Sequence, residues 1–284
     1  MTAAARRRTA RLAAAAALVL GAGPVAAQGP ADPNLAHPHE IVTVARDGYT
    51  ISGLAVSLPG SSGRRHGIAL FPGHPGILRL REENGQPAFD LRGNFLVRSR
   101  RHWLDAETLV LMVDAPSDEW AAFPQHFRET PRYGDDVRAL IEEAGRRHRV
   151  AEWTFVGTSE GSVSAFHAAR MNPGLARRLV LTSSVFSPSR HGPGLSGADF
   201  GGYPHPLLWV HHAEDPCRYT AYGDAKAFAA RTGRPLVTVR GGGPWRGAAC
   251  EAHTAHGFAG LEREVVAAMQ AWVKTGAAPA DVGP

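Results

Sequence analysis

Short apolar runs alternate with amphipathic segments along most of this chain. Buried strands are predicted at residues 67–71, 108–115, 152–157, 178–186, 206–212 and 235–242. Apolar residues at helical spacing lie between them, at 94–106, 133–148, 161–171, 221–233 and 260–274. Continuous apolar strands that alternate with helices are typical of a parallel sheet covered on both faces. The sequence therefore predicts an α/β fold, with a hairpin around Asp47-Gly48 at its start.

One large domain is expected, because the chain has 284 residues and contains no linker or internal repeat. We expect this domain at residues 40–276. A Pro-rich N-terminal lead, a loose segment, is expected before it at 28–39, and a C-terminal tail after it at 277–284. Apolar residues make up 44% of the chain and charged residues 20%, a composition that excludes a disordered or collagen-like protein.

Residues 1–27 have the features of a secretory signal. A basic start at 6–11 precedes an apolar core from Leu12, and the small residues Val25 and Ala27 place cleavage before Gln28. The apolar run is shorter than the roughly 20 residues that a membrane span needs, although an N-terminal anchor is the alternative. We therefore expect a periplasmic or secreted protein without stable membrane insertion.

The net charge of +5 comes mostly from the predicted signal, which holds four arginines and no acid. The remaining chain has 27 basic and 26 acidic residues. A nearly neutral protein lacks the positive charge that polyanions attract, so no nucleic-acid partner is expected.

The segment Gly157-Thr158-Ser159-Glu160-Gly161 matches the pattern G-x-S-x-G. It lies between a predicted strand and a predicted helix, where a sharp turn exposes the serine hydroxyl and small flanking residues avoid collisions. A serine hydroxyl is a weak nucleophile until a base accepts its proton. The pattern therefore makes Ser159 a candidate nucleophile that requires a histidine and a carboxylate.

Two later loops supply candidates for these partners. Asp215 and Glu214 follow the predicted strand at 206–212, and His256 and His253 precede the last helix. In a Ser-His-Asp triad the histidine accepts the serine proton and the carboxylate orients the imidazole. The sequence contains each residue type in a suitable place but leaves two choices open.

From about Glu40 to Lys274 the chain resembles the α/β-hydrolase superfamily, and "NFLVRSR", "VDAPSD" and "LTSSVFSPS" resemble a group of exported bacterial hydrolases. The order Ser, Asp, His is that of the superfamily. The resemblance implies an eight-stranded sheet and ester or amide hydrolysis. Its acid turn favours Asp215 over Glu214, and its His-Gly-Phe pattern favours His256 over His253.

The resemblance also implies an oxyanion hole built from two backbone N–H groups. One belongs to Glu160, directly after the nucleophile, and the other to His74 in "FPGHPG". The superfamily often has His-Gly at this turn, where this chain has Pro72-Gly73. A plain β-turn without a role in binding is the alternative for this loop.

A large helical cap over the site is not expected. About 20 loop residues, 187–206, separate two predicted strands, which leaves room for a small cap or none. A flap is expected instead from residues 117–133, where Trp120, Phe123 and Phe127 are candidates for an apolar substrate pocket. Packing of this loop onto the domain is the alternative role for these three side chains.

Cys217 and Cys250 are the two cysteines of the chain. An even count in an exported protein predicts one disulfide, with two buried thiols as the alternative. The bridge would join the loop of Asp215 to the loop of His256.

An exported carboxylesterase acting on a small-molecule ester, without metal or cofactor, is the leading hypothesis. An amidase or peptidase with the same triad and a non-catalytic binding protein are the alternatives. The fourteen histidines show no metal-ligand spacing, so a metal site is not expected. The sequence gives no prediction of oligomeric state.

Overall fold

The computed structural model describes residues 37–61 and 65–284, which belong to one compact unit. The predicted signal at 1–27, its cleavage site before Gln28 and most of the predicted lead at 28–39 lie outside the described residues. The first strand begins at His39, one residue before the predicted start of the domain. No helix in the described part is long and apolar enough to cross a membrane.

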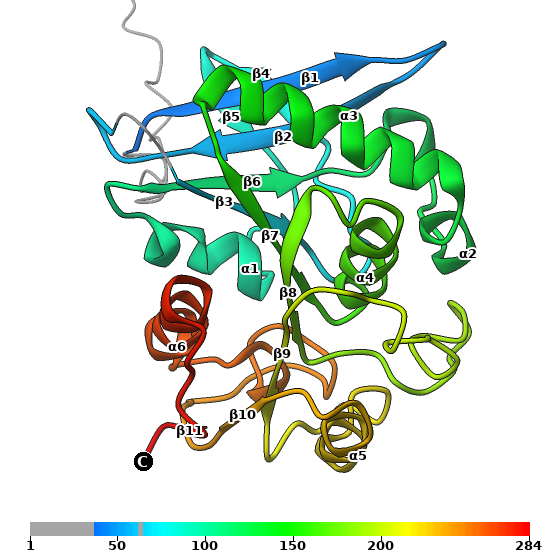
Figure 1. Cartoon of the computed structure of the whole chain (residues 1–284), viewed down its shortest axis with the longest axis vertical. Coiled ribbons are helices and arrows are strands. Elements are labelled where there is room, and N and C mark those ends of the chain that lie inside the picture. Colours follow the sequence, from blue (N-terminus) through cyan, green and yellow to red (C-terminus); the bar gives the residue numbers. More distant parts are fainter. Residues whose placement is uncertain (1–36, 62–64) are drawn as a thin grey trace, which may run out of the picture. The chain divides into compact units, whose positions relative to one another are not determined.

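A mostly parallel sheet forms the centre of this unit (Figure 1). Its strands lie in the order β1-β2-β6-β3-β7-β8-β9-β10-β11, and all neighbours pair in parallel except β1 with β2 and β2 with β6. The strand bounds are β1 (His39–Ala45), β2 (Thr50–Val56), β3 (His66–Phe71), β6 (Thr108–Val113), β7 (Glu152–Thr158), β8 (Ala176–Thr182), β9 (Leu207–His212), β10 (Leu236–Val239) and β11 (Asp281–Val282). The predicted α/β class and the N-terminal hairpin are confirmed.

The described sheet has nine strands instead of eight, because the predicted C-terminal tail contributes β11. The amide of Thr238 donates to the carbonyl of Ala280, and the amide of Arg240 donates to that of Val282. The two-residue strand thereby satisfies backbone groups along the outer edge of β10, which a sheet edge otherwise leaves unpaired.

Helices cover both faces of the sheet, as predicted (Figure 1). Helix α1 (Phe95–Ser99), the 3₁₀ turn η2 (Arg100–Trp103) and α6 (Glu262–Thr275) pack on one face, and α3 (Pro131–His148), α4 (Gly161–Met171) and α5 (Tyr222–Thr232) pack on the other. The apolar run of β7 is continuous because both faces of this strand are buried. Phe155 packs toward α3 and α4, and Val156 packs toward the cluster on the opposite face.

The sequence does not predict the shortest elements, because they span too few residues for a period of apolar side chains to be visible. They are the hairpin of β4 (Arg81–Glu83) and β5 (Gln86–Ala88), the 3₁₀ turns η3 (Ser117–Glu119) and η4 (Ala255–Gly257), and α2 (Gln125–Arg128). Residues 187–206 contain no helix, in agreement with the prediction of a small cap or none.

Candidate active site

Ser159 occupies a strained turn between the end of β7 and the start of α4. Its φ is +52°, a left-handed conformation that costs a non-glycine residue about 1–3 kcal/mol. A Cβ on Gly157 would lie 2.8 Å from that of Ala165, and a Cβ on Gly161 would overlap the carbonyl of Phe71. The two glycines of the motif therefore allow the strand, the turn and the helix to approach one another.

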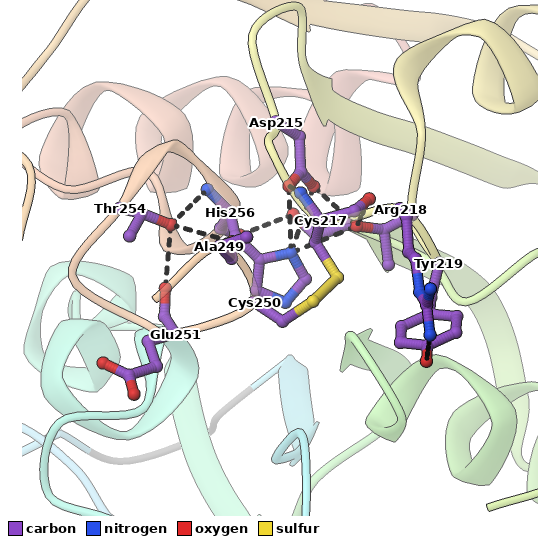
Figure 2. Close-up of a disulfide and its surroundings, with 11 residues drawn as sticks. Asp215, Cys217, Arg218, Tyr219, Ala249, Cys250, Glu251, Thr254 and His256 are labelled. Atoms are coloured by element: carbon purple, nitrogen blue, oxygen red, sulfur yellow. Dashed lines mark hydrogen bonds and ion pairs between the residues drawn. A yellow bond between two sulfur atoms is a disulfide. The ribbon is translucent and has the colours of Figure 1, made fainter. Parts of the chain in front are cut away.

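Asp215 and His256 form a buried hydrogen-bonded pair (Figure 2). The Nδ1–H of His256 donates to Oδ2 of Asp215 over 3.0 Å. The side chain of Asp215 is completely buried, and it also accepts hydrogen bonds from the amide of Cys217 at 2.9 Å and the hydroxyl of Thr220 at 2.8 Å. Because Nδ1 carries the proton, Nε2 of His256 is left as the basic nitrogen.

The four candidate partners of Ser159 lie in different surroundings. Glu214 is exposed, whereas Asp215 points toward the imidazole of His256. The ring of His253 lies against Gly93. The structure thus brings together the acid and the base that the family resemblance favours.

Ser159 and His256 line the same cleft, of about 400 Å³, which we call the His256 cleft. Within the described residues the Ser159 hydroxyl makes no hydrogen bond, so its contact with His256 is not formed in this structure. Catalytic hydrogen bonds are often long without substrate and tighten when it binds. The serine is thus beside the acid–base pair but not bonded to it.

The predicted oxyanion-hole residues lie beside Ser159. Gly73 passes so close that a Cβ there would lie 3.0 Å from the Cβ of Ser159, and His74 follows it in the chain. Within the described part, neither the backbone N–H of His74 nor that of Glu160 has a hydrogen-bond partner. Both donors are therefore free to bind an oxyanion.

A buried arginine that the sequence analysis missed connects these two donors. Arg128 is completely buried at the end of α2. Its Nη2 donates to the carbonyl of Pro75 at 2.9 Å and lies 3.5 Å from the Glu160 carboxylate, while its Nη1 donates to the hydroxyl of Ser164 at 2.9 Å. The guanidinium thus holds the loop of His74 against the start of α4. The sequence around Arg128 does not indicate this role, because Arg128 matches no motif and lies in the segment that is predicted to form a flap.

The Glu160 side chain is an anion held by several donors. Burial alone would raise its pKa, but the hydrogen bond from His74 at 3.0 Å and the charge of Arg128 lower the pKa below its ordinary value. Gln125 contacts its other oxygen over 3.4 Å. Glu160 is therefore ionised and has its charge balanced within the protein.

Cys217 and Cys250 form the predicted disulfide, with their Cα atoms 4.6 Å apart (Figure 2). Cys217 follows Asp215 by two residues and donates its amide to that carboxylate. Cys250 lies six residues before His256 in the chain. The bridge therefore joins the acid loop to the base loop.

Removing this bridge in a Cys217→Ala/Cys250→Ala variant should lower the free energy of unfolding by about 3–4 kcal/mol, because 33 residues separate the two cysteines. The loops of Asp215 and His256 would also be held less firmly against each other. Urea unfolding measures the change in stability, and equal stability in variant and parent would contradict this role.

Trp120, Phe123 and Phe127, the predicted pocket residues, lie away from the clefts beside Ser159. Phe123 and Phe127 are buried in the core around Tyr133, with ring centroids 5.5 and 6.0 Å from that ring. Trp120 packs against the same cluster and donates its indole N–H to the carbonyl of Ala115. These aromatic residues are used to attach the 117–133 segment to the domain, so they are not part of the site proposed below.

A second cleft beside Ser159 is built largely from the segment 187–206 and the loop after β9. It has a volume of about 650 Å³ and is lined by Val185, Pro188, Arg190, His191, Arg218 and the disulfide, among others. We call it the arginine cleft. His74, Ser159 and Glu160 also line it, so Ser159 lies where the two clefts meet.

Comparisons with known proteins identify the fold. No protein-family profile matches the chain, and no curated protein sequence matches it. Among solved structures, Est1E from Butyrivibrio proteoclasticus is similar with a TM-score of 0.55 and 14% identity, over 82% of this chain and 97% of that one. A thermophilic carboxylesterase, EstE1, from a metagenomic library is similar with a TM-score of 0.54 and 15% identity, over 86% and 91%.

A cold-adapted esterase from an Arctic intertidal metagenomic library is also similar, with a TM-score of 0.51 and 14% identity. The match covers 72% of this chain and 84% of that one. These structures show that the chain has the α/β-hydrolase fold, as the sequence resemblance implied.

Proposed function

We propose that this protein is an exported serine hydrolase that cleaves carboxylic esters. The observation that carries the proposal is the buried Asp215–His256 hydrogen bond in a cleft that also contains the strained Ser159 turn. A paired acid and base beside a serine that lines a cleft at a strand-to-helix turn is the arrangement that activates such a nucleophile. Two of the similar structures are named as esterases, which favours ester over amide cleavage.

In the proposed reaction, Oγ of Ser159 attacks the ester carbonyl while Nε2 of His256 takes the hydroxyl proton. Asp215 stabilises the resulting imidazolium through Nδ1. The backbone N–H groups of His74 and Glu160 bind the oxyanion of the tetrahedral intermediate. When the intermediate collapses, the C–O bond to the alcohol breaks and His256 gives its proton to the leaving oxygen.

Water then removes the acyl group from Ser159. His256 takes a proton from the water as its oxygen attacks the acyl carbonyl, and the same two N–H groups bind the second oxyanion. Collapse releases the carboxylic acid and returns the proton to Ser159. The cycle uses side chains and backbone groups of this chain and leaves them unchanged.

Export is the second part of the proposal. Residues 1–27 would direct the chain out of the cytoplasm and be removed before Gln28. The disulfide supports this, since such bonds persist in oxidising compartments.

Labelling with a fluorophosphonate probe tests the hydrolase activity, because only an activated serine reacts with the probe. The N-terminus of the same labelled protein tests the predicted cleavage of the signal. The full-length protein is expressed in a bacterial host, and the labelled periplasmic or secreted product is analysed by intact-mass and peptide mass spectrometry. We expect one label on Ser159, an N-terminus at Gln28 and no labelling of a Ser159→Ala variant. A folded protein that stays unlabelled would indicate a non-catalytic binding protein, and retention of residues 1–27 would contradict cleavage.

A further inference from the structure

The arginine cleft has two arginines in its lining, Arg190 and Arg218. Among the described residues that line it, Glu160 is the only acid, and the charge of its buried side chain is already balanced by Arg128. The lining of the cleft therefore carries excess positive charge next to the nucleophile.

Neither cleft arginine is neutralised within the described part of the chain, where neither forms an ion pair with an acid. Nε of Arg190 donates to Nε2 of His191 over 3.1 Å. Arg218 donates to the hydroxyl of Tyr219 over 2.6 Å, with its guanidinium 4.7 Å from the centre of that ring. These neutral partners orient both guanidinium groups while leaving their charge available.

The chemistry of the proposed reaction assigns one half of the ester to this cleft. The leaving oxygen must reach His256 to be protonated, and His256 lines the other cleft. The alcohol part of the ester then lies in the His256 cleft. The acyl chain consequently extends past Ser159 into the arginine cleft, along Val185, Pro188 and the disulfide.

We propose that the substrate is an ester whose acyl chain ends in a carboxylate, that is, a monoester of a dicarboxylic acid. This inference rests on the proposed hydrolase function and adds the class of acyl group. A guanidinium group matches a carboxylate with two parallel hydrogen bonds. A cleft lined by charge of one sign also concentrates ligands of the opposite sign.

A cation site is the competing interpretation of the same region. Potential ligand atoms of His74, Glu160 and His191 lie within 4.8 Å of one another, close enough that they could hold a metal ion. The ion pair with Arg128 already balances the single carboxylate, and Arg190 donates to a ring nitrogen of His191. A dication would therefore meet uncompensated positive charge, so the electrostatics favour an anion.

The test compares two esters of the same length and shape that differ in charge. One is monoethyl adipate, and the other carries a carboxamide in place of its free carboxylate. For the parent protein we expect kcat/KM to be at least about tenfold higher for the charged ester, because hydrogen bonds from a guanidinium to a carboxylate are stronger than those to a neutral amide. Raising the NaCl concentration should lower kcat/KM for the charged ester more than for the neutral one.

Charge reversal supplies the decisive variants. In Arg190→Glu, Arg218→Glu and the double variant, the ratio of the two kcat/KM values should fall stepwise and invert in the double variant. Arg101→Glu is the matched control, because Arg101 is exposed, lies outside both clefts and gives the same change in net charge. The control should keep the parent ratio.

Binding of adipate, measured by isothermal titration calorimetry, separates this inference from the proposed function. Adipate should bind the parent and lose at least tenfold in affinity in the double variant. Adipate binding without any cleavage of p-nitrophenyl acetate would support the anion site and overturn the hydrolase. Cleavage of p-nitrophenyl acetate with equal kcat/KM for the matched esters, in parent and double variant alike, would overturn the anion site.

Discussion

Replacing Ser159 with alanine should lower kcat/KM for p-nitrophenyl acetate by about 10⁴-fold or more. The substitution removes the atom proposed to attack the carbonyl. The proposed oxyanion donors of His74 and Glu160 are backbone groups that the change leaves intact, so a small residual rate should remain. The measurement is steady-state hydrolysis followed by absorbance of the released nitrophenolate.

Ser196→Ala is the matched control, since Ser196 is exposed on the 187–206 segment and its hydroxyl bonds only to the carbonyl of Pro193. It should keep the parent rate, and thermal unfolding should show that both variants are folded. If Ser159→Ala retained the parent kcat/KM, the proposed nucleophile would be wrong.

Replacing Arg128 with methionine should lower the free energy of unfolding by about 3–5 kcal/mol. The guanidinium is completely buried, and its loss leaves the Glu160 carboxylate without its balancing charge. The carbonyl of Pro75 and the hydroxyl of Ser164 would lose a donor as well. Activity should fall in parallel, because Arg128 fixes the loop of His74 relative to Glu160.

A double variant, Arg128→Met/Glu160→Gln, separates charge from packing. Removing the unpaired carboxylate should recover part of the lost stability, because a buried neutral amide costs less than a buried unpaired charge. The backbone N–H of residue 160 is retained in this variant. Denaturant unfolding measures both changes, and a double variant no more stable than Arg128→Met would show that the ion pair contributes little.

The local sequence determined the order of the elements and the type of sheet. The apolar runs and the helical spacing correspond to the main strands and helices, because the period of apolar residues reflects which side of each element is buried. The G-x-S-x-G pattern is also visible in the local sequence, and Gly157 is required by atoms a few residues away. Gly161 is instead required by the carbonyl of Phe71 in β3, which only the tertiary structure brings close. The disulfide followed from the count of two cysteines.

The choice of partners and the shape of the pocket were decided by the tertiary structure. Asp215 was separated from Glu214, and His256 from His253, by the direction in which each side chain points, which one-dimensional spacing does not specify. Trp120, Phe123 and Phe127 have an apolar character that suits a pocket or a core equally well, and packing against Tyr133 places Phe123 and Phe127 in the core.

The sequence is limited in the same way for charged side chains, as Arg128, Arg190 and Arg218 show. The sequence determined that these side chains are cationic, but burial beside Glu160 or exposure in a cleft depends on contacts between segments far apart in the chain. Local periodicity encodes what is buried in each element. Long-range packing alone determines which charges meet, and therefore where a reaction can occur and what it can bind.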